Sequence, residues 1–209
     1  PISRDAPPPL TTRRETLFPD TSLVRSVLRQ GFNLRDSGLR VLVGNRADEY
    51  ADQARADGFS VLPIAEAAAQ GDVVLLLIPD EVIPEVFARD IAPGLSPGKA
   101  LVFASGYNVA FGFLQPPPGV DVVLVAPRMI GAGVRDLYVA GRGFPSFIGV
   151  AQDATGRARE VALALAKGIG STRAGVVEVT FAQEAELDLF TEQCFGPAFG
   201  QVLTTAVDL

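Results

Sequence analysis

The chain has 209 residues, enough for one or two domains with a substantial core, which excludes a small disulfide-stapled module. Its formal charge of −6 argues against a general nucleic-acid or anionic-membrane surface. Histidine is absent, which removes the commonest general base and the usual zinc ligand, and the single cysteine, Cys194, cannot form an internal disulfide. We see neither a signal peptide nor an apolar run long enough to cross a bilayer, so we expect a cytoplasmic protein.

The first 20 residues are rich in proline and predict an extended arm. Apolar residues then recur at helical spacing from Thr21 to Asp36 and predict a helix. The segment that follows alternates between predicted strands and predicted helices. The strands fall at 40–44, 59–62, 72–79, 99–105, 121–127 and 145–152, and the helices at 47–58, 64–69, 80–89 and 154–167.

Alternating strands and helices predict an α/β fold, a Rossmann-like doubly wound parallel sheet over residues 21–177. The run DVVLLLIP at 72–79 is too apolar for a sheet with one wet face. It favours a central parallel strand that is covered on both faces.

The remaining residues, 178–209, have no strand signal after Thr180 and predict a helix. The chain ends within that helix or just beyond it. The apolar residues of this helix must be buried against either the Rossmann-like domain or another chain. These residues are Leu187, Phe190, Phe195, Phe199 and Val202.

Ligands of doubly wound sheets bind at the carboxyl ends of the strands, so the loops after 44, 79, 105 and 127 are candidate sites. After Gly44, Asn45 and Arg46 stand where such folds distinguish NAD from NADP, and an arginine there favours the NADP phosphate. A solvated arginine is the alternative. After Pro79, Asp80 is either a cofactor contact or a simple helix cap.

The loops SGYN at 105–108 and APRMIGAG at 126–133 combine glycines with polar side chains. Glycine permits a ligand to approach the backbone closely. Tight turns without a ligand are the alternative for both loops.

Three carboxylates, Glu184, Asp188 and Glu192, share one face of the last predicted helix at i, i+4 and i+8. Like charges at this spacing repel each other. A hard divalent cation such as Mg²⁺ would convert that repulsion into a binding site, whereas a hydrated face would tolerate it at small cost.

From residue 33 onward the chain resembles the ketol-acid reductoisomerases of branched-chain amino-acid synthesis, which couple Mg²⁺-assisted alkyl migration to NADPH reduction of a 2-acetolactate-type substrate. The resemblance implies an NADP-dependent oxidoreductase, with NAD as the alternative, that acts on a small 2-hydroxy-3-keto acid. The matching segments, in chain order, are NLRDSG, LLIPDEVIPEVF, IAPGL, GVDVVLVAPR, YVAGRGFPSFIGVAQDATGRARE, ALAKGIGSTRAGVVEVTF and ELDLFTEQ.

The resemblance also implies roles for individual residues. In the family the ELDLFTEQ-like segment opens an all-helical domain through which members oligomerise. The resemblance therefore implies that residues 178–209 are the first helix of such a domain and that the protein forms a homodimer or larger assembly. The same segment binds Mg²⁺ in the family, which implies a metal on Asp188 and Glu192 and leaves Glu184 without a carried-over role. An active-site histidine of the family aligns with Ser105, before Gly106, and a lysine aligns with Arg128. We therefore expect Ser105 and Arg128 as catalytic residues, and Gly106 among the cofactor contacts.

One departure concerns the glycine-rich turn that the family places before NLRDSG. The three glycine positions fall here on Ser22, Val24 and Val27. Side chains there would block the approach of a pyrophosphate to the helix start. Either cofactor binding is impaired or a segment around 15–30 is missing, and a non-catalytic homologue that keeps the fold and the oligomer interface is the alternative function.

Overall fold

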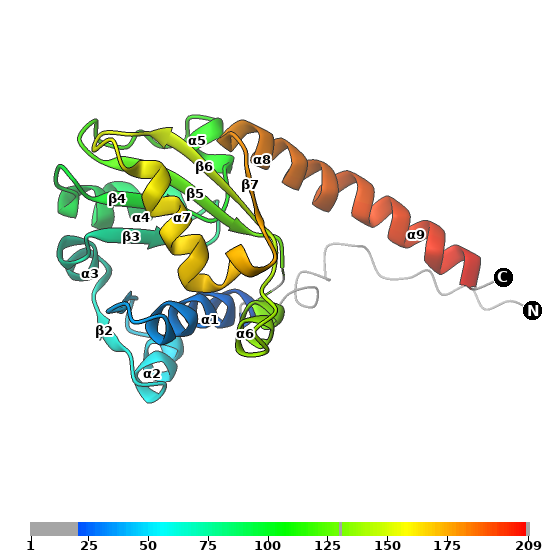
Figure 1. Cartoon of the computed structure of the whole chain (residues 1–209), viewed down its shortest axis with the longest axis horizontal. Coiled ribbons are helices and arrows are strands. Elements are labelled where there is room, and N and C mark those ends of the chain that lie inside the picture. The colour runs from blue at the N-terminus through cyan, green and yellow to red at the C-terminus, as the bar shows by residue number, and fades with distance from the viewer. Residues whose placement is uncertain (1–20, 130, 208–209) are drawn as a thin grey trace, which may run out of the picture.

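The structure is a computed structural model that describes residues 21–129 and 131–207, so the arm predicted at 1–20 lies outside it. Two sheets are flanked by helices, and a long helical arm projects from them (Figure 1). The strands are β1 (Leu42–Gly44), β2 (Ser60–Leu62), β3 (Val73–Leu76), β4 (Ala100–Phe103), β5 (Asp121–Pro127), β6 (Ser146–Gln152) and β7 (Val176–Glu178).

Sequence reasoning predicted most of the helices but missed α5 and α6, and it also missed strand β7. The bounds of all the helices follow. They are α1 (Thr21–Asp36), α2 (Glu49–Ala56), α3 (Ile64–Gln70), α4 (Ile83–Val86), α5 (Tyr107–Ala110), α6 (Gly131–Val139), α7 (Ala158–Ile169), α8 (Phe181–Leu189) and α9 (Gly196–Val207). Two π-helical segments, Phe87–Ile91 and Phe190–Phe195, continue α4 and α8.

The larger sheet has the strand order β3-β4-β5-β6-β7, and β1 pairs with β2 in a separate sheet. All pairs are parallel except β5 with β6, which run antiparallel. The α/β Rossmann-like fold is thus confirmed, with one reversed strand.

The prediction that 72–79 forms a central strand is wrong within the described residues. β3 pairs only with β4 and forms the edge of its sheet, and Val73 exposes 36% of its surface. The apolar composition of this strand is that of an interior strand. Among residues 21–129 and 131–207 no strand pairs with its other edge, and β3 lines a groove there.

The core lies on both faces of the larger sheet, as expected for a doubly wound fold. Along β4, Leu101 and Phe103 belong to one buried cluster, whereas Val102 belongs to the other. This alternation follows from the two-residue period of a strand. The first cluster includes α4, and the second includes α7.

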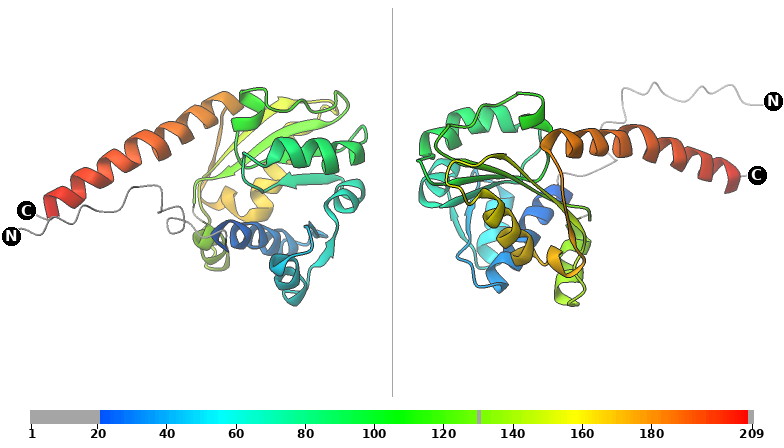
Figure 2. Two further views of the ribbon diagram at one scale, coloured as in Figure 1. Left: turned by 180° about the vertical axis from the view of Figure 1, so that it is seen from behind. Right: turned by 45° about the horizontal axis from the view of Figure 1, so that its top comes forward.

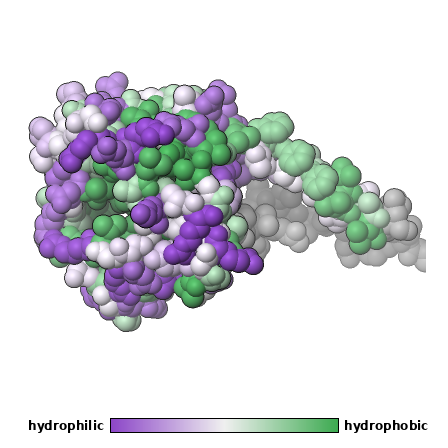
Figure 3. Space-filling model, viewed as in Figure 1, coloured by the Kyte–Doolittle hydropathy of each residue, from purple (hydrophilic) through white to green (hydrophobic). Residues whose placement is uncertain are grey.

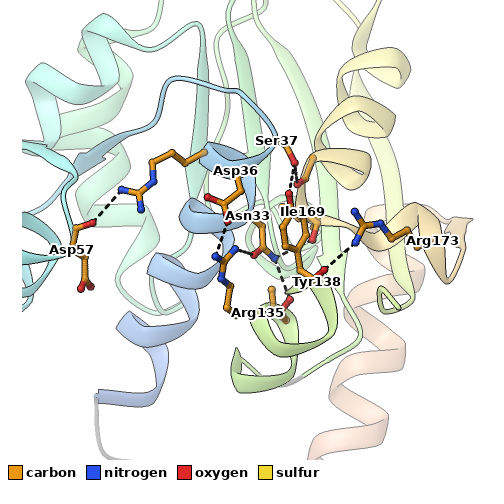
Figure 4. A network of polar contacts seen from close by, with 11 residues as sticks. Asn33, Asp36, Ser37, Asp57, Arg135, Tyr138, Ile169 and Arg173 are labelled. Atoms are coloured by element: carbon orange, nitrogen blue, oxygen red, sulfur yellow. Dashed lines mark hydrogen bonds and ion pairs between the residues drawn. The ribbon is translucent and has the colours of Figure 1, made fainter. Parts of the chain in front are cut away.

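A buried polar network fixes α1 against α6 and α7 (Figure 4). Asn33, fully buried, donates from Nδ2 to the carbonyl oxygens of Val134 and Ile169, at 3.1 Å each. Its Oδ1 accepts from Arg135 Nη1 at 2.9 Å. Because every polar atom of this side chain has a partner, the network orients α1 without an unpaired polar group.

The predicted C-terminal helix is confirmed as an arm built from α8, the π-helical turn Phe190–Phe195 and α9 (Figure 2). Thr180 begins α8 with a capping box: its Oγ1 accepts from the Gln183 N–H, and the Gln183 side chain accepts from the Thr180 N–H. The root of α8 is buried, while apolar residues lie exposed farther along the arm (Figure 3). None of the helices in the described part of the chain could span a membrane.

Candidate active site

Three segments that are distant in sequence meet at the carboxyl ends of β4 and β5. Ser105 and Gly106 follow β4, and Arg128 directly follows β5. The chain then forms β6, α7 and β7 before α8 returns with Glu184 and Asp188 to the same point. The parallel sheet supplies the loops at this edge, and α8 brings the carboxylates to them.

Glu184 is the centre of this cluster and is only 1% exposed. Its Oε2 accepts a hydrogen bond of 2.6 Å from the Gly106 N–H, and its Oε1 lies 3.3 Å from Arg128 Nη1. The same Arg128 nitrogen lies 2.7 Å from Asp188 Oδ1. The guanidinium also stacks over the Phe147 ring, 5.1 Å from its centroid. One arginine thus bridges two carboxylates of α8.

Burial raises the pKa of Glu184 from 4.5 to about 7. The Gly106 N–H and Arg128 lower this pKa, whereas the neighbouring Asp188 and Asp80 charges raise it further. Because desolvation exceeds the stabilising contacts, this carboxyl can change protonation near neutral pH. Strongly shifted groups of this kind are concentrated at functional sites.

Gly106 makes the approach of α8 possible. A Cβ atom on this residue would collide with the Phe181 carbonyl oxygen and would lie 3.1 Å from Glu184 Oε2. Only a residue without a side chain allows the β4–α5 turn to reach the start of α8. Gly106 therefore lies in the predicted site, and its contact here is with α8.

Asp80 joins the same cluster from the loop after β3. Asn108, 1% exposed, donates from Nδ2 to the Asp80 carbonyl oxygen at 3.0 Å and to Oδ1 at 2.8 Å. Desolvation raises the pKa of Asp80, and hydrogen bonds from Ser105 and Asn108 oppose that rise. The alternative that Asp80 caps a helix is wrong, because the cap residue of α4 is Val82 and no side chain caps it.

The other predicted cofactor contacts lie at the ends of β1 and β3. Asn45 Oδ1 accepts from the Arg46 N–H, and Arg46 Nε lies 3.2 Å from Asp48 Oδ2. The Arg46 side chain is 85% exposed, so it can reach an incoming anion. Asn45 and Pro79 line a groove of about 1300 Å³ that separates β1 from β3.

The predicted metal ligands, Asp188 and Glu192, lie on either side of the start of the π-helical turn. Partial burial raises the pKa of Glu192, and the Asp188 charge raises it further. Arg128, 2.7 Å from Asp188, offsets part of this repulsion. Carboxylate oxygens are the ligands that a hard cation such as Mg²⁺ prefers. Within the described residues no cluster of three or more acidic, histidine or cysteine side chains is suited to a metal ion.

Sequence reasoning missed two residues of the cluster. Glu184 was grouped with the other carboxylates of α8, and neither its burial nor its contact with Gly106 was anticipated. Asn108 was missed although it stands in the SGYN loop. Its Oδ1 is buried and, among the described residues, has no hydrogen-bond partner. The polar composition of that loop was the available signal.

The fold and the cluster together define a Rossmann-like domain with a candidate ligand site at the carboxyl ends of its parallel strands. Residues 27–175 match the family described as "Acetohydroxy acid isomeroreductase, NADPH-binding domain". Since this match covers more than half of the chain, the protein belongs to that family.

Individual relatives agree with this assignment. The chain is 53% identical over 165 residues to a ketol-acid reductoisomerase (NADP(+)) from Pyrobaculum arsenaticum, covering 78% of this chain and 50% of the relative. It is also similar to the structure of an NADH-preferring ketol-acid reductoisomerase from an uncultured archean, with 42% identity and a TM-score of 0.79, covering 85% of this chain and 58% of the other. The chain thus spans about half the length of these relatives.

A more distant structure shares the fold alone. It is a semialdehyde dehydrogenase NAD-binding protein from Cupriavidus necator, with 22% identity and a TM-score of 0.74, covering 88% of this chain and 69% of the other.

Proposed function

We propose that this chain binds NADP at the carboxyl ends of β1 and β3 and contributes the first half of a ketol-acid reductoisomerase active site. The observation that carries the proposal is the cluster in which Arg128 bridges Glu184 and Asp188 beside Ser105 and Gly106. This cluster lies at the strand edge where such sheets bind their ligands. Family membership and the two relatives named as ketol-acid reductoisomerases support the same activity.

Arg46 is the residue we assign to the choice of cofactor. One relative is named for NADP(+) and another structure as NADH-preferring, so the family includes both preferences. An exposed guanidinium after β1 can pair with the phosphate that distinguishes NADP from NAD. Its neighbour Asp48 is only partly exposed and holds Arg46 near the end of the strand.

The chain's own residues would position the substrate, bind its carboxylate and hold a proton near it. Asp188 and Glu192 would hold Mg²⁺, which would supply Lewis-acid polarisation of the oxygen atoms of a 2-hydroxy-3-keto acid, and NADPH would supply the hydride. Ser105 and Arg128 line the site, where the guanidinium can bind a carboxylate and the hydroxyl can donate a hydrogen bond. Glu184 can hold a proton at neutral pH, because burial raises its pKa to about 7.

A cofactor titration tests this proposal. We expect NADPH to bind the folded chain more tightly than NADH, and Arg46→Ala to weaken NADPH binding about tenfold while leaving NADH binding nearly unchanged. Fluorescence of the reduced nicotinamide reports both affinities. Arg55→Ala, a change to an exposed arginine on α2, serves as the control.

If neither NADPH nor NADH binds at millimolar concentration, the proposed function is contradicted. An equal loss for NADPH and NADH in Arg46→Ala would contradict the role of Arg46 in cofactor choice.

A further inference from the structure

The helical arm in Figure 2 contains a turn, Phe190–Phe195, that is wound as a π-helix. The Gly196 N–H closes this turn with a hydrogen bond to the carbonyl oxygen of Thr191, five residues earlier. In an α-helix the same N–H would donate to the carbonyl four residues earlier. The turn therefore holds one more residue than an α-helical turn, and single π-helical turns of this kind are frequent at functional sites.

The aromatic rings of the arm show the same winding. Phe190 and Phe195 are five residues apart and stack at a centroid distance of 6.3 Å, with 24° between their planes. An α-helix advances by about 100° per residue, so side chains five residues apart would differ by about 140° around its axis. Phe195 and Phe199 are four residues apart and stack at 5.6 Å, as an α-helix allows. The extra residue thus lies between Phe190 and Phe195.

Gly196 and Pro197 account for the position of this turn. A proline inside an α-helix lacks the N–H for its hydrogen bond, and its ring clashes with the carbonyl group four residues earlier, here that of Gln193. A wider turn before the proline relieves this clash. A Cβ atom on Gly196 would lie 2.8 Å from the Thr191 carbonyl oxygen, so a side chain here would push away the acceptor of the closing hydrogen bond. Pro197 thus disfavours α-helical winding, and Gly196 permits the π-helical one.

The two proposed Mg²⁺ ligands lie at this turn. Asp188 precedes it by two residues, and Glu192 lies within it. In a regular α-helix, residues four apart differ by about 40° around the axis. Because a π-helical turn takes more residues, each step is smaller, and Glu192 comes closer to the direction of Asp188. The charges of Asp188 and Arg128 both act on Glu192, so its carboxylate lies on the side of the arm that faces the cluster.

We propose that Gly196 and Pro197 are positioning residues for the Mg²⁺ site, because they hold the π-helical turn that aligns Glu192 with Asp188. The inference rests on the proposed function, which assigns Mg²⁺ to these two carboxylates. Gly196 and Pro197 have no side-chain ligand to offer, so they act only through the backbone of the turn. Without the turn, Glu192 would rotate away from Asp188, and the two oxygen donors would hold one cation less well.

The double variant Gly196→Ala with Pro197→Ala tests this role, because alanine is the best helix former and favours α-helical winding at both positions. The variant should therefore fold, with a melting temperature without metal that is equal to or higher than that of the unaltered chain. Its affinity for Mg²⁺ should nevertheless fall about fivefold. A pair of residues that only stabilised the arm would change stability and affinity in the same direction.

NMR spectroscopy of the full chain measures both effects. Contacts between the Phe190 and Phe195 rings report the π-helical turn, and we expect the double variant to lose them. The amide signals of residues 188–192, followed during a titration with Mg²⁺ alone, report the affinity. Gly200→Ala is the control, because Gly200 lies on the same arm with open space around it. This variant should keep both the ring contact and the Mg²⁺ affinity of the unaltered chain.

The possible failures are distinguishable. If the unaltered chain lacks the contact between Phe190 and Phe195, the π-helical turn is not formed, and the inference is overturned. It is equally overturned if the double variant keeps this contact, or loses the contact and still binds Mg²⁺ as the unaltered chain does. An unaltered chain whose signals do not respond to Mg²⁺ would contradict the metal site of the proposed function, and the inference with it.

Discussion

Glu184 is deeply buried beside the charged groups of Arg128, Asp188 and Asp80, and its protonation makes the stability of the fold depend on pH. Its pKa is raised to about 7 in the folded chain, from 4.5. Between these values the folded state binds more protons than the unfolded state. The contribution of Glu184 to stability is therefore present at low pH and is lost as the pH rises through about 7.

We predict that Glu184→Gln removes this dependence. Relative to the unaltered chain, the variant should gain between about 1 and 3 kcal/mol in unfolding free energy as the pH rises from 5 to 8. Denaturant unfolding in metal-free buffer measures the difference. Glu186→Gln changes an exposed carboxylate of the same helix and should show no such trend. Parallel pH profiles for Glu184→Gln and the unaltered chain would contradict the assignment.

If Asp188 and Glu192 bind Mg²⁺, adding this ion should raise the melting temperature. Partial burial raises the pKa of Glu192, and repulsion from the Asp188 carboxylate raises it further. A bound cation would relieve this repulsion and stabilise the folded state by mass action. If Mg²⁺ binding raises the free energy of unfolding by about 1 kcal/mol, the melting temperature of a chain of this size should rise by about 2–4 °C.

Asp188→Asn should abolish the Mg²⁺ response, whereas Glu186→Gln should retain it. Melting curves with and without Mg²⁺ provide the measurement. An equal response of Asp188→Asn and the unaltered chain would exclude Asp188 as a ligand.

The residues of the site were only partly predictable from the sequence. Ser105, Gly106, Arg128, Asp80 and Asp188 were anticipated, and the structure brings them together, because the carboxyl ends of parallel strands meet at one edge. The burial of Glu184 could not be predicted, since helical spacing places it on the same face as Asp188 without saying how deep the helix root is packed.

At the scale of elements, the contact between the β4–α5 turn and α8 determines where the arm begins. A Cβ atom on Gly106 would collide with the Phe181 backbone. We predict that Gly106→Ala destabilises the fold by about 1–3 kcal/mol, because either the turn or the helix must shift.

Gly200→Ala is the matched control. Gly200 lies within α9 and has open space around its Cα, so alanine there should be neutral or stabilising by up to about 1 kcal/mol. Chemical denaturation of both variants measures the two effects. Equal stabilities of the two variants would show that the turn accommodates a side chain.

The order of elements was largely predictable, but the neighbours of each strand were not. The strand at 121–127 coincides with β5 because its apolar run ends at a proline and a charged residue. The run at 72–79 has the composition of a central strand, yet in the part of the chain that the structure describes β3 lies at the edge of its sheet. Composition reports how a strand is buried in a complete sheet, and it does not reveal whether both neighbours are present. The antiparallel direction of β6 likewise left no local signal.

At the scale of the whole molecule, the arm leaves a row of aromatic rings exposed. Phe195 stacks with Phe190 and Phe199, at centroid distances of 6.3 and 5.6 Å, and each ring is more than half exposed. Exposed apolar surface of this kind favours association. We therefore propose a homodimer or larger assembly that buries this face.

We predict that Phe195→Glu shifts the protein towards the monomer. Light scattering at tens of micromolar should report an assembly for the unaltered chain and for Val139→Glu, a control at an exposed apolar residue of α6. A stable, fully soluble monomer of the unaltered chain would contradict the proposed assembly.

The helical arm is long, so a small change of angle where it joins the sheet domain gives a large displacement at its far end. From Phe181 to Val207 the helical path extends over 27 residues, or about 40 Å at 1.5 Å per residue. A tilt of about 5° at the root would displace the tip by about 3 Å, roughly the rise of two residues. The close approach of Gly106 to the Phe181 carbonyl is one of the contacts that orient the arm, together with those of Arg128 with Glu184 and Asp188. A substitution that tilts α8 at this point would displace the far end of the arm most.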